Sequence, residues 1–208
     1  GFIMGLVKLN DRGVRSATTY GSLGTGSMTF IKKLTASSSA TLDFVDGASD
    51  VVLDDTYKEY MFTFKDIHPE TNDVSFQFQG NVAGGSGYNE TITSTTFQAF
   101  HNEADTDSGL QYSTSADLAQ GTGFQTIVGN LGSDNDQSVS GYLRLFNPSS
   151  TTFIKHFLGS ASQAQQSDAI YNTFFAGYFN LTGAIDEIQF KMSSGNIDAG
   201  DICLYGIL

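Results

Sequence analysis

The fold is decided by the stretch FKMSSGNIDAGDICLYGI, which spans residues 190–207. It begins with alternating apolar and polar residues, passes through a Ser-Ser-Gly-Asn turn and an Asp-Ala-Gly-Asp corner, and ends in a second apolar stretch. A period of two residues is typical of a strand with one buried face, and Gly, Asn, Asp and Ser are the residues that turns prefer. This terminal strand is predicted to lie in the core of a closed β-sandwich.

The same alternation extends upstream through most of the chain. Tyr60, Phe62 and Phe64 alternate with more polar residues, and so do Phe76 and Phe78. These two strands are predicted to form a hairpin across residues 66–73. We count about ten short strands separated by turn residues, with one short helix expected around residues 115–119. The pattern predicts an all-β fold, an antiparallel β-sandwich of jelly-roll type.

Two parts of the chain differ in composition. Residues 1–26 have weak periodicity and end in a Gly-Ser-Thr-rich stretch typical of a flexible linker, so we expect an extended N-terminal arm. Residues 27–208 are expected to form one sandwich domain, since 17 Phe and 9 Tyr supply large core side chains. Cys203 is the single cysteine, which excludes an internal disulfide. No stretch approaches the roughly 20 apolar residues of a membrane span.

The net charge of −12 is unevenly distributed. Residues 1–33 hold one acid and five of the ten basic residues, which leaves −16 on the remainder. Such an acidic body argues against nucleic acid as a partner. A basic arm is instead expected to dock on an acidic surface, either another protein or a neighbouring copy in a homotrimer. The docking residues would be Lys8, Arg12, Arg15, Lys32 and Lys33.

Several long phrases carry a resemblance to a known family. They are residues 33–41, 57–69, 97–124, 147–157 (NPSSTTFIKHF) and 188–200. With them the chain resembles, over about residues 4 to 207, virion-associated proteins of marine tailed phages. That family is mostly described as structural or uncharacterised. The resemblance implies a virion context, assembly in the host cytoplasm and other virion proteins as partners, and it brings no catalytic residues.

Two polar segments, residues 80–89 and 101–111, are the expected recognition loops because long polar loops expose their side chains. Tyr88 and Tyr112 offer stacking planes, and Asn89, Glu103 and Asp105 offer hydrogen-bonding groups for a receptor or host-surface saccharide. The alternative is that these loops only connect strands. A sugar-binding face could also be assembled from tyrosines, namely Tyr20, Tyr57, Tyr88, Tyr112, Tyr142, Tyr171 and Tyr178.

Metal and catalytic signals are weak. On an extended segment His101, Glu103, Asp105 and Asp107 would share a face and could hold a divalent cation, but a solvated acidic loop explains them equally well. Structural calcium in the acidic loops is an open alternative, although no complete calcium loop is present. We find no paired carboxylates, no G-x-S-x-G elbow and no phosphate-binding loop. No cofactor is therefore expected.

These observations predict a non-enzymatic virion structural protein. The favoured version is a tail-fibre or receptor-binding head, because the body is acidic, loop-rich and aromatic. One alternative is a capsid decoration protein. Others are a carbohydrate-binding module and a polysaccharide-degrading jelly roll.

Overall fold

A computed structural model describes residues 27–208, which form strands, turns and loops. The strands are β1 (Met28–Thr35), β2 (Leu42–Val45), β3 (Glu59–Pro69), β4 (Val74–Val82), β5 (Ile92–Asn102), β6 (Ser108–Tyr112), β7 (Ala119–Gly121), β8 (Gln125–Leu131), β9 (Val139–Phe146), β10 (Lys155–Gln165), β11 (Ala169–Phe179), β12 (Ile185–Met192) and β13 (Ile197–Ile207). Within this described range no helix could cross a membrane. The predicted all-β class is confirmed. The helix expected at residues 115–119 is wrong, since turns and the short strand β7 occupy that stretch.

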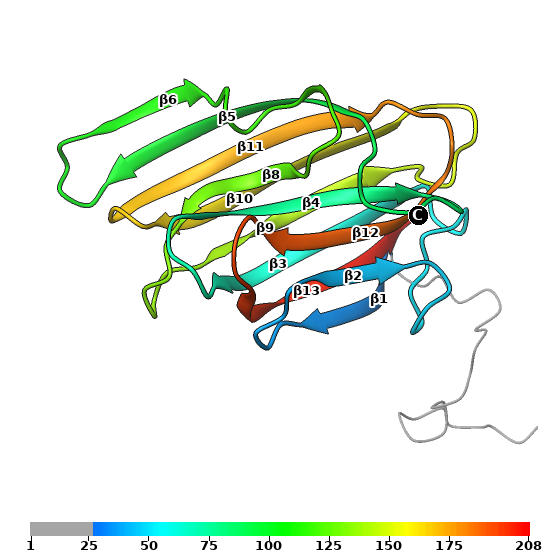
Figure 1. Cartoon of the computed structure of the whole chain (residues 1–208), viewed down its shortest axis with the longest axis horizontal. Helices are drawn as coiled ribbons and strands as arrows, with labels where there is room; N and C mark the ends of the chain where they lie inside the picture. Colours follow the sequence, from blue (N-terminus) through cyan, green and yellow to red (C-terminus); the bar gives the residue numbers. More distant parts are fainter. Residues whose placement is uncertain (1–26) are drawn as a thin grey trace, which may run out of the picture.

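The strands form two layers (Figure 1). The large sheet runs in the order β1-β13-β3-β9-β10-β11-β5, and both β6 and β7 pair with the outer edge of β5. The small sheet runs in the order β2-β12-β4-β8. All pairings are antiparallel. Only one residue pair, Gln165 with Leu131, connects β10 to β8 and so joins the two sheets.

The predicted hairpin between β3 and β4 is wrong. β3 pairs with β13 and β9 in the large sheet, whereas β4 pairs with β12 and β8 in the small sheet. The intervening residues therefore cross from one layer to the other. β3, β4 and β12 each have one apolar face, as the alternation predicted, but these faces meet across the sandwich.

The C-terminal strand lies inside the large sheet, as predicted. β13 pairs with β1 on one side and with β3 on the other. The Asp-Ala-Gly-Asp corner is part of this strand, and it forms a bulge where the pairing with β3 is irregular on both sides of Ala199. Gly200 has φ of 114°, and a Cβ there would lie 2.5 Å from the carbonyl oxygen of Asp66. Only glycine fits this bulge without strain.

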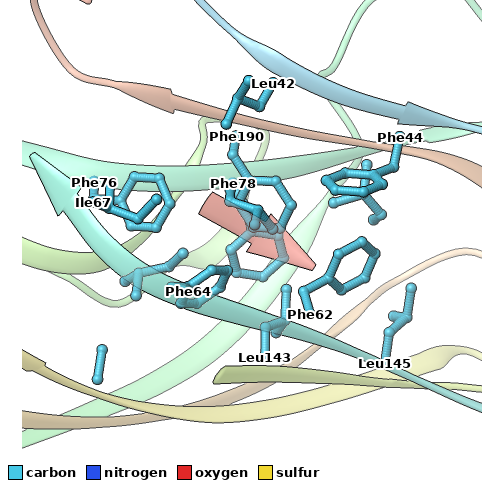
Figure 2. Packing of buried hydrophobic residues seen from close by; sticks show 14 of the residues in the cluster. Leu42, Phe44, Phe62, Phe64, Ile67, Phe76, Phe78, Leu143, Leu145 and Phe190 are labelled. Atoms are coloured by element: carbon cyan, nitrogen blue, oxygen red, sulfur yellow. The ribbon is translucent and has the colours of Figure 1, made fainter. Parts of the chain in front are cut away.

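Phe190 of β12 is the centre of the core (Figure 2). Its ring centroid lies 5.3 to 6.2 Å from those of five other phenylalanines, which are Phe44, Phe62, Phe64, Phe76 and Phe78. Phe62 and Phe64 come from the large sheet, and the other three come from the small sheet. Buried aromatic rings at these separations attract each other beyond the gain from burial alone. Phe190 therefore ties the two layers together.

Phenyl rings pack on glycines where the large sheet continues into β10 and β11. Phe157 is opposite Gly177, and Phe175 is opposite Gly159. A Cβ at Gly159 would lie 2.3 Å from the ring of Phe175, and one at Gly177 would lie 2.6 Å from the ring of Phe157. The glycines thus provide the space in which two large rings lie flat on the sheet.

We predict that Phe190→Ala lowers the free energy of unfolding by about 3–5 kcal/mol, because it removes a buried ring and leaves a cavity between the layers. Urea denaturation followed by circular dichroism measures this. Phe153→Ala is the matched control, since Phe153 is 68% exposed and should change stability by less than about 0.5 kcal/mol. Equal losses in the two variants would show that the ring cluster does not hold the layers together.

Candidate functional site

A polar cleft forms where β8 separates from β10. Beyond the single pair of Gln165 with Leu131, the large sheet continues through β11, β5 and β6, whereas the small sheet ends at β8. A cleft of about 380 Å³ lies between this extension and the edge of the small sheet. Its size falls within the roughly 300–1,000 Å³ of small-molecule sites.

The lining is polar but almost uncharged. It consists of side-chain amides, hydroxyls and one carboxylate, with small residues between them; the polar members are Gln98, Gln111, Asn130 and Gln165, Ser75, Ser113, Ser115, Thr126 and Tyr171, and Asp73. The carboxylate of Asp73 accepts a hydrogen bond of 2.7 Å from the amide nitrogen of Asn130. The remaining groups can both donate and accept hydrogen bonds. This combination suits a neutral ligand with several hydroxyl groups.

The wall formed by the large sheet is held in place by its own contacts. Gln98 is 8% exposed, and its Nε2 donates a 3.1 Å hydrogen bond to the hydroxyl of Thr173 on β11. Tyr171 is opposite Phe100 on β5, and the two rings stack with centroids 5.1 Å apart. The amide of Gln98 and the ring of Tyr171 are therefore fixed before any ligand arrives, which lowers the entropy cost of binding.

Two buried glutamines connect the opposing walls. Nε2 of Gln163 on β10 donates to the carbonyl oxygen of Gly129 on β8, at 2.8 Å. Nε2 of Gln125 on β8 donates to the carbonyl oxygen of Ala116, also at 2.8 Å. Both side chains are almost fully buried, and neither Oε1 atom has a hydrogen-bond donor among the described residues. Buried polar groups normally have hydrogen-bond partners, so leaving the two Oε1 atoms without donors costs stability. The hydrogen bonds from the two Nε2 atoms offset this cost, because they attach the sheet extension to β8.

The residues predicted as a recognition surface do not come together. Tyr88 and Asn89 follow β4 and precede β5, whereas Glu103 and Asp105 lie in the turn after β5. β5 has 11 residues, so its two ends are roughly 35 Å apart. Tyr112 lies on β6, and its hydroxyl donates a 2.6 Å hydrogen bond to Asp117. None of these five residues lines the cleft.

The predicted common face of residues 101–107 is wrong, because the chain turns there instead of staying extended. Oδ1 of Asn102 accepts hydrogen bonds from the backbone nitrogens of Thr106 and Asp107, both 3.0 Å long. His101 contacts Asp105 at 3.1 Å across this turn. Among residues 27–208, no group of three or more His, Cys, Asp or Glu side chains could hold a metal ion.

The basic residues predicted to form a docking arm are divided between two parts of the chain. Lys8, Arg12 and Arg15 lie outside the described residues. Lys32 and Lys33 belong to β1, an edge strand of the large sheet. Nζ of Lys33 lies 3.2 Å from Oδ2 of Asp201 on β13. Lys33 thus forms an ion pair between the neighbouring strands β1 and β13. Lysines on an edge strand also discourage another chain from pairing with that edge.

A second hollow, of about 500 Å³, lies at the end of the sandwich near the β5–β6 turn. Its lining includes four carboxylates, which are Glu103, Asp134, Asp136 and Asp168. Like charges grouped in this way favour a hydrated surface. The hollow fits a hydroxylated ligand less well than the neutral cleft does.

The sequence analysis includes two members of the cleft. Tyr171 is one of the seven tyrosines considered for sugar binding, and Gln111 ends the predicted recognition segment 101–111. The other glutamines were not singled out. The available signal was a change in side-chain type: Gln98 and Gln163 occupy inward-facing strand positions that are apolar elsewhere in the chain. An inward amide indicates a place where one sheet lacks an apolar partner.

Tyr88 is nevertheless held in a defined environment. Its ring centroid lies 6.4 Å from that of Phe124. Burial raises the pKa of the Tyr88 hydroxyl, and the carboxylates of Glu187 and Asp43 raise it further. Both carboxylates belong to the small sheet, so the phenol is engaged on that sheet and is not a free contact group.

The chain matches no protein-family model, no curated protein and no solved structure. The interpretation of the cleft therefore depends on its own residues.

The environment of Tyr88 gives a pH-dependent prediction. A raised pKa means that the folded chain keeps a proton that the unfolded chain loses near about pH 10. The associated stabilisation is complete below that pH and is lost as the pH rises through the folded-state pKa. We expect Tyr88→Phe to reduce the loss of stability between roughly pH 8 and pH 10.5, measured from urea midpoints.

Tyr60→Phe is a second variant for the same experiment, since burial also raises the pKa of Tyr60. Alkaline losses identical to wild type in both variants would contradict the prediction.

Proposed function

We propose that this chain is a non-enzymatic virion protein of a tailed phage, of the receptor-binding type, and that it recognises a neutral saccharide in the polar cleft. The cleft between β8 and the extension of the large sheet is the observation that carries this proposal. The virion context rests on the sequence resemblance.

The order of pairing supports the jelly-roll type. Without β5, β6, β7, β10 and β11, eight strands remain, with β1-β13-β3-β9 in one sheet and β2-β12-β4-β8 in the other. The first strand then pairs with the last, the second with the seventh, the third with the sixth and the fourth with the fifth. Such nested pairing is what a long antiparallel ribbon gives when it rolls into two sheets. The five omitted strands are two insertions that extend the large sheet.

The chemistry of the cleft favours a sugar. Saccharides present hydroxyl groups at their edges and apolar C–H groups on their ring faces. The amides of Gln98, Gln111 and Gln165 can bind hydroxyl groups in either hydrogen-bonding direction. The Tyr171 ring supplies an aromatic surface in the same cleft. A charged ligand would find no oppositely charged side chain in this lining except Asp73, which Asn130 already engages.

Binding without hydrolysis is the version that the lining favours. Most glycosidases use two carboxyl groups, about 5 to 9.5 Å apart, on either side of the bond that they cleave. The cleft lining has one, Asp73. We therefore favour saccharide binding over polysaccharide degradation as the function of the cleft.

The location in the virion has two versions. A receptor-binding head would use the cleft at the tail, and a decoration protein would use the body to cover the capsid. Purified protein that binds host cells favours the first version, and purified protein that binds only capsids favours the second. Assembly into a homo-oligomer, such as the homotrimer expected from the sequence, is part of the same proposal, since tail proteins and capsid proteins both act as assemblies.

We predict that the purified chain binds members of a panel of immobilised neutral oligosaccharides and does not bind sulfated or uronic-acid oligosaccharides. Gln111→Ala and Tyr171→Ala should each weaken the affinity about tenfold, which corresponds to ~1.4 kcal/mol for the loss of one hydrogen-bonding group or one stacking surface. Isothermal titration calorimetry with the best-bound oligosaccharide measures the change.

Tyr88→Ala and Asn89→Ala are the controls, because both residues lie outside the cleft and should leave the affinity unchanged. If these two variants lose binding and the cleft variants keep it, the recognition surface is the loop after β4. If the panel shows no binding, the saccharide proposal is wrong.

A further inference from the structure

The outer face of the large sheet is uncharged where it is widest. The side chains that point away from the core are those of the odd-numbered residues in β5 and of the even-numbered residues in β10 and β11. Apart from His101 and His156, none of these outward side chains is ionisable near neutral pH. The outer face of the small sheet is different, since it carries Asp43, Glu187 and Lys191. β9 continues this face and adds one charged side chain, Arg144, which is paired with Glu59. A face with so little charge is unusual for a chain with a net charge of −12.

This face also exposes aromatic and aliphatic side chains. Phe97 on β5 and Phe174 on β11 are opposite each other, and their rings stack at 5.0 Å with an interplanar angle of 13°. They are 43% and 37% exposed, and Tyr112 on β6 continues the row at 52%. Leu158 on β10 contributes to two apolar hollows of about 420 and 210 Å³ on the same face. Contiguous exposed apolar surface of this kind marks an interaction site.

The size of the face matches a protein partner. From β6 through β5, β11 and β10 to β9 there are five neighbouring strands (Figure 1). At about 4.8 Å per strand and about 3.3 Å per residue, the 46 residues of these five strands cover roughly 730 Å². Stable protein interfaces bury about 800 Å² on each partner. A small ligand would leave most of this surface uncovered.

Charge identifies the partner. Two copies of an acidic chain repel each other wherever their carboxylates approach, and only an uncharged surface lets them meet at contact distance. We propose that a second copy of this chain docks on the outer face of β6, β5, β11, β10 and β9, with Phe97 and Phe174 at the centre of the interface. Stacked aromatic residues near the centre of a patch are typical of residues that dominate binding energy.

This interface differs physically from association through the basic arm. An apolar contact keeps or gains strength as salt is added, because salt does not screen the burial of apolar surface. An arm held on an acidic body by ion pairs weakens over the same range. The cleft lies on the inner side of the same sheet extension, so docking here leaves it open.

The test uses the full-length chain in sedimentation-equilibrium centrifugation at low and high salt. We expect self-association that persists at high salt. The double variant F97E/F174E should dissociate to monomers, since it places carboxylates at the centre of the interface. L110E/Y112E is a second variant at more exposed positions, where a loss of folding is least expected, and it should weaken association at least tenfold. Circular dichroism and thermal melting confirm that each variant is folded.

The matched control is the full-length charge-reversal variant K8E/R12E/R15E, which should associate as the wild type does. A monomeric wild type would overturn the proposal. So would an oligomer that dissociates in the arm variant but persists in both folded face variants.

Discussion

The contact between the two layers at Phe190 is the constraint on which the rest of the structure depends. Phe190 packs against phenylalanines from both sheets. The strand pairing between the two sheets is limited to a single residue pair, Gln165 with Leu131. Hydrogen bonds therefore hold each sheet together internally, and apolar packing sets the distance and angle between the sheets. A smaller side chain at this position would loosen the attachment of the small sheet without breaking any strand pairing.

The cleft follows from unequal sheet sizes. The small sheet covers the inner face of the large sheet only as far as β8. Beyond that edge the inward positions change from phenylalanine to polar residues, such as Thr96, Gln98 and Thr173. These side chains cannot be buried against an apolar layer, and they pair with each other or face the cleft. The two insertions thus create a polar surface that the eight-stranded body does not have.

The sequence predicted the strands better than their partners. Alternation around Phe62, Phe76 and Phe190 located buried faces, since a period of two residues is a local property. It carried no information on which faces meet, so β3 and β4 were assigned to one hairpin although they belong to different layers. The predicted recognition residues are separated for a related reason: Tyr88 and Glu103 are both close in sequence to β5, but they lie at its opposite ends. The turn at Asn102 was missed because one side-chain amide, bonded to the backbone, reverses the chain.

The position of β13 has a consequence for biosynthesis. Met28 at the start of β1 pairs with Ile207 at the end of β13, and β3 needs the same strand on its free side. A growing polypeptide therefore displays β1 and one edge of β3 without partners until residue 207 has left the ribosome. Those unpaired edges, which carry Phe30, Phe62 and Phe64, are surfaces on which nascent chains can aggregate or recruit chaperones. The large sheet therefore closes in a late step, and pairing between residues so distant in sequence forms slowly.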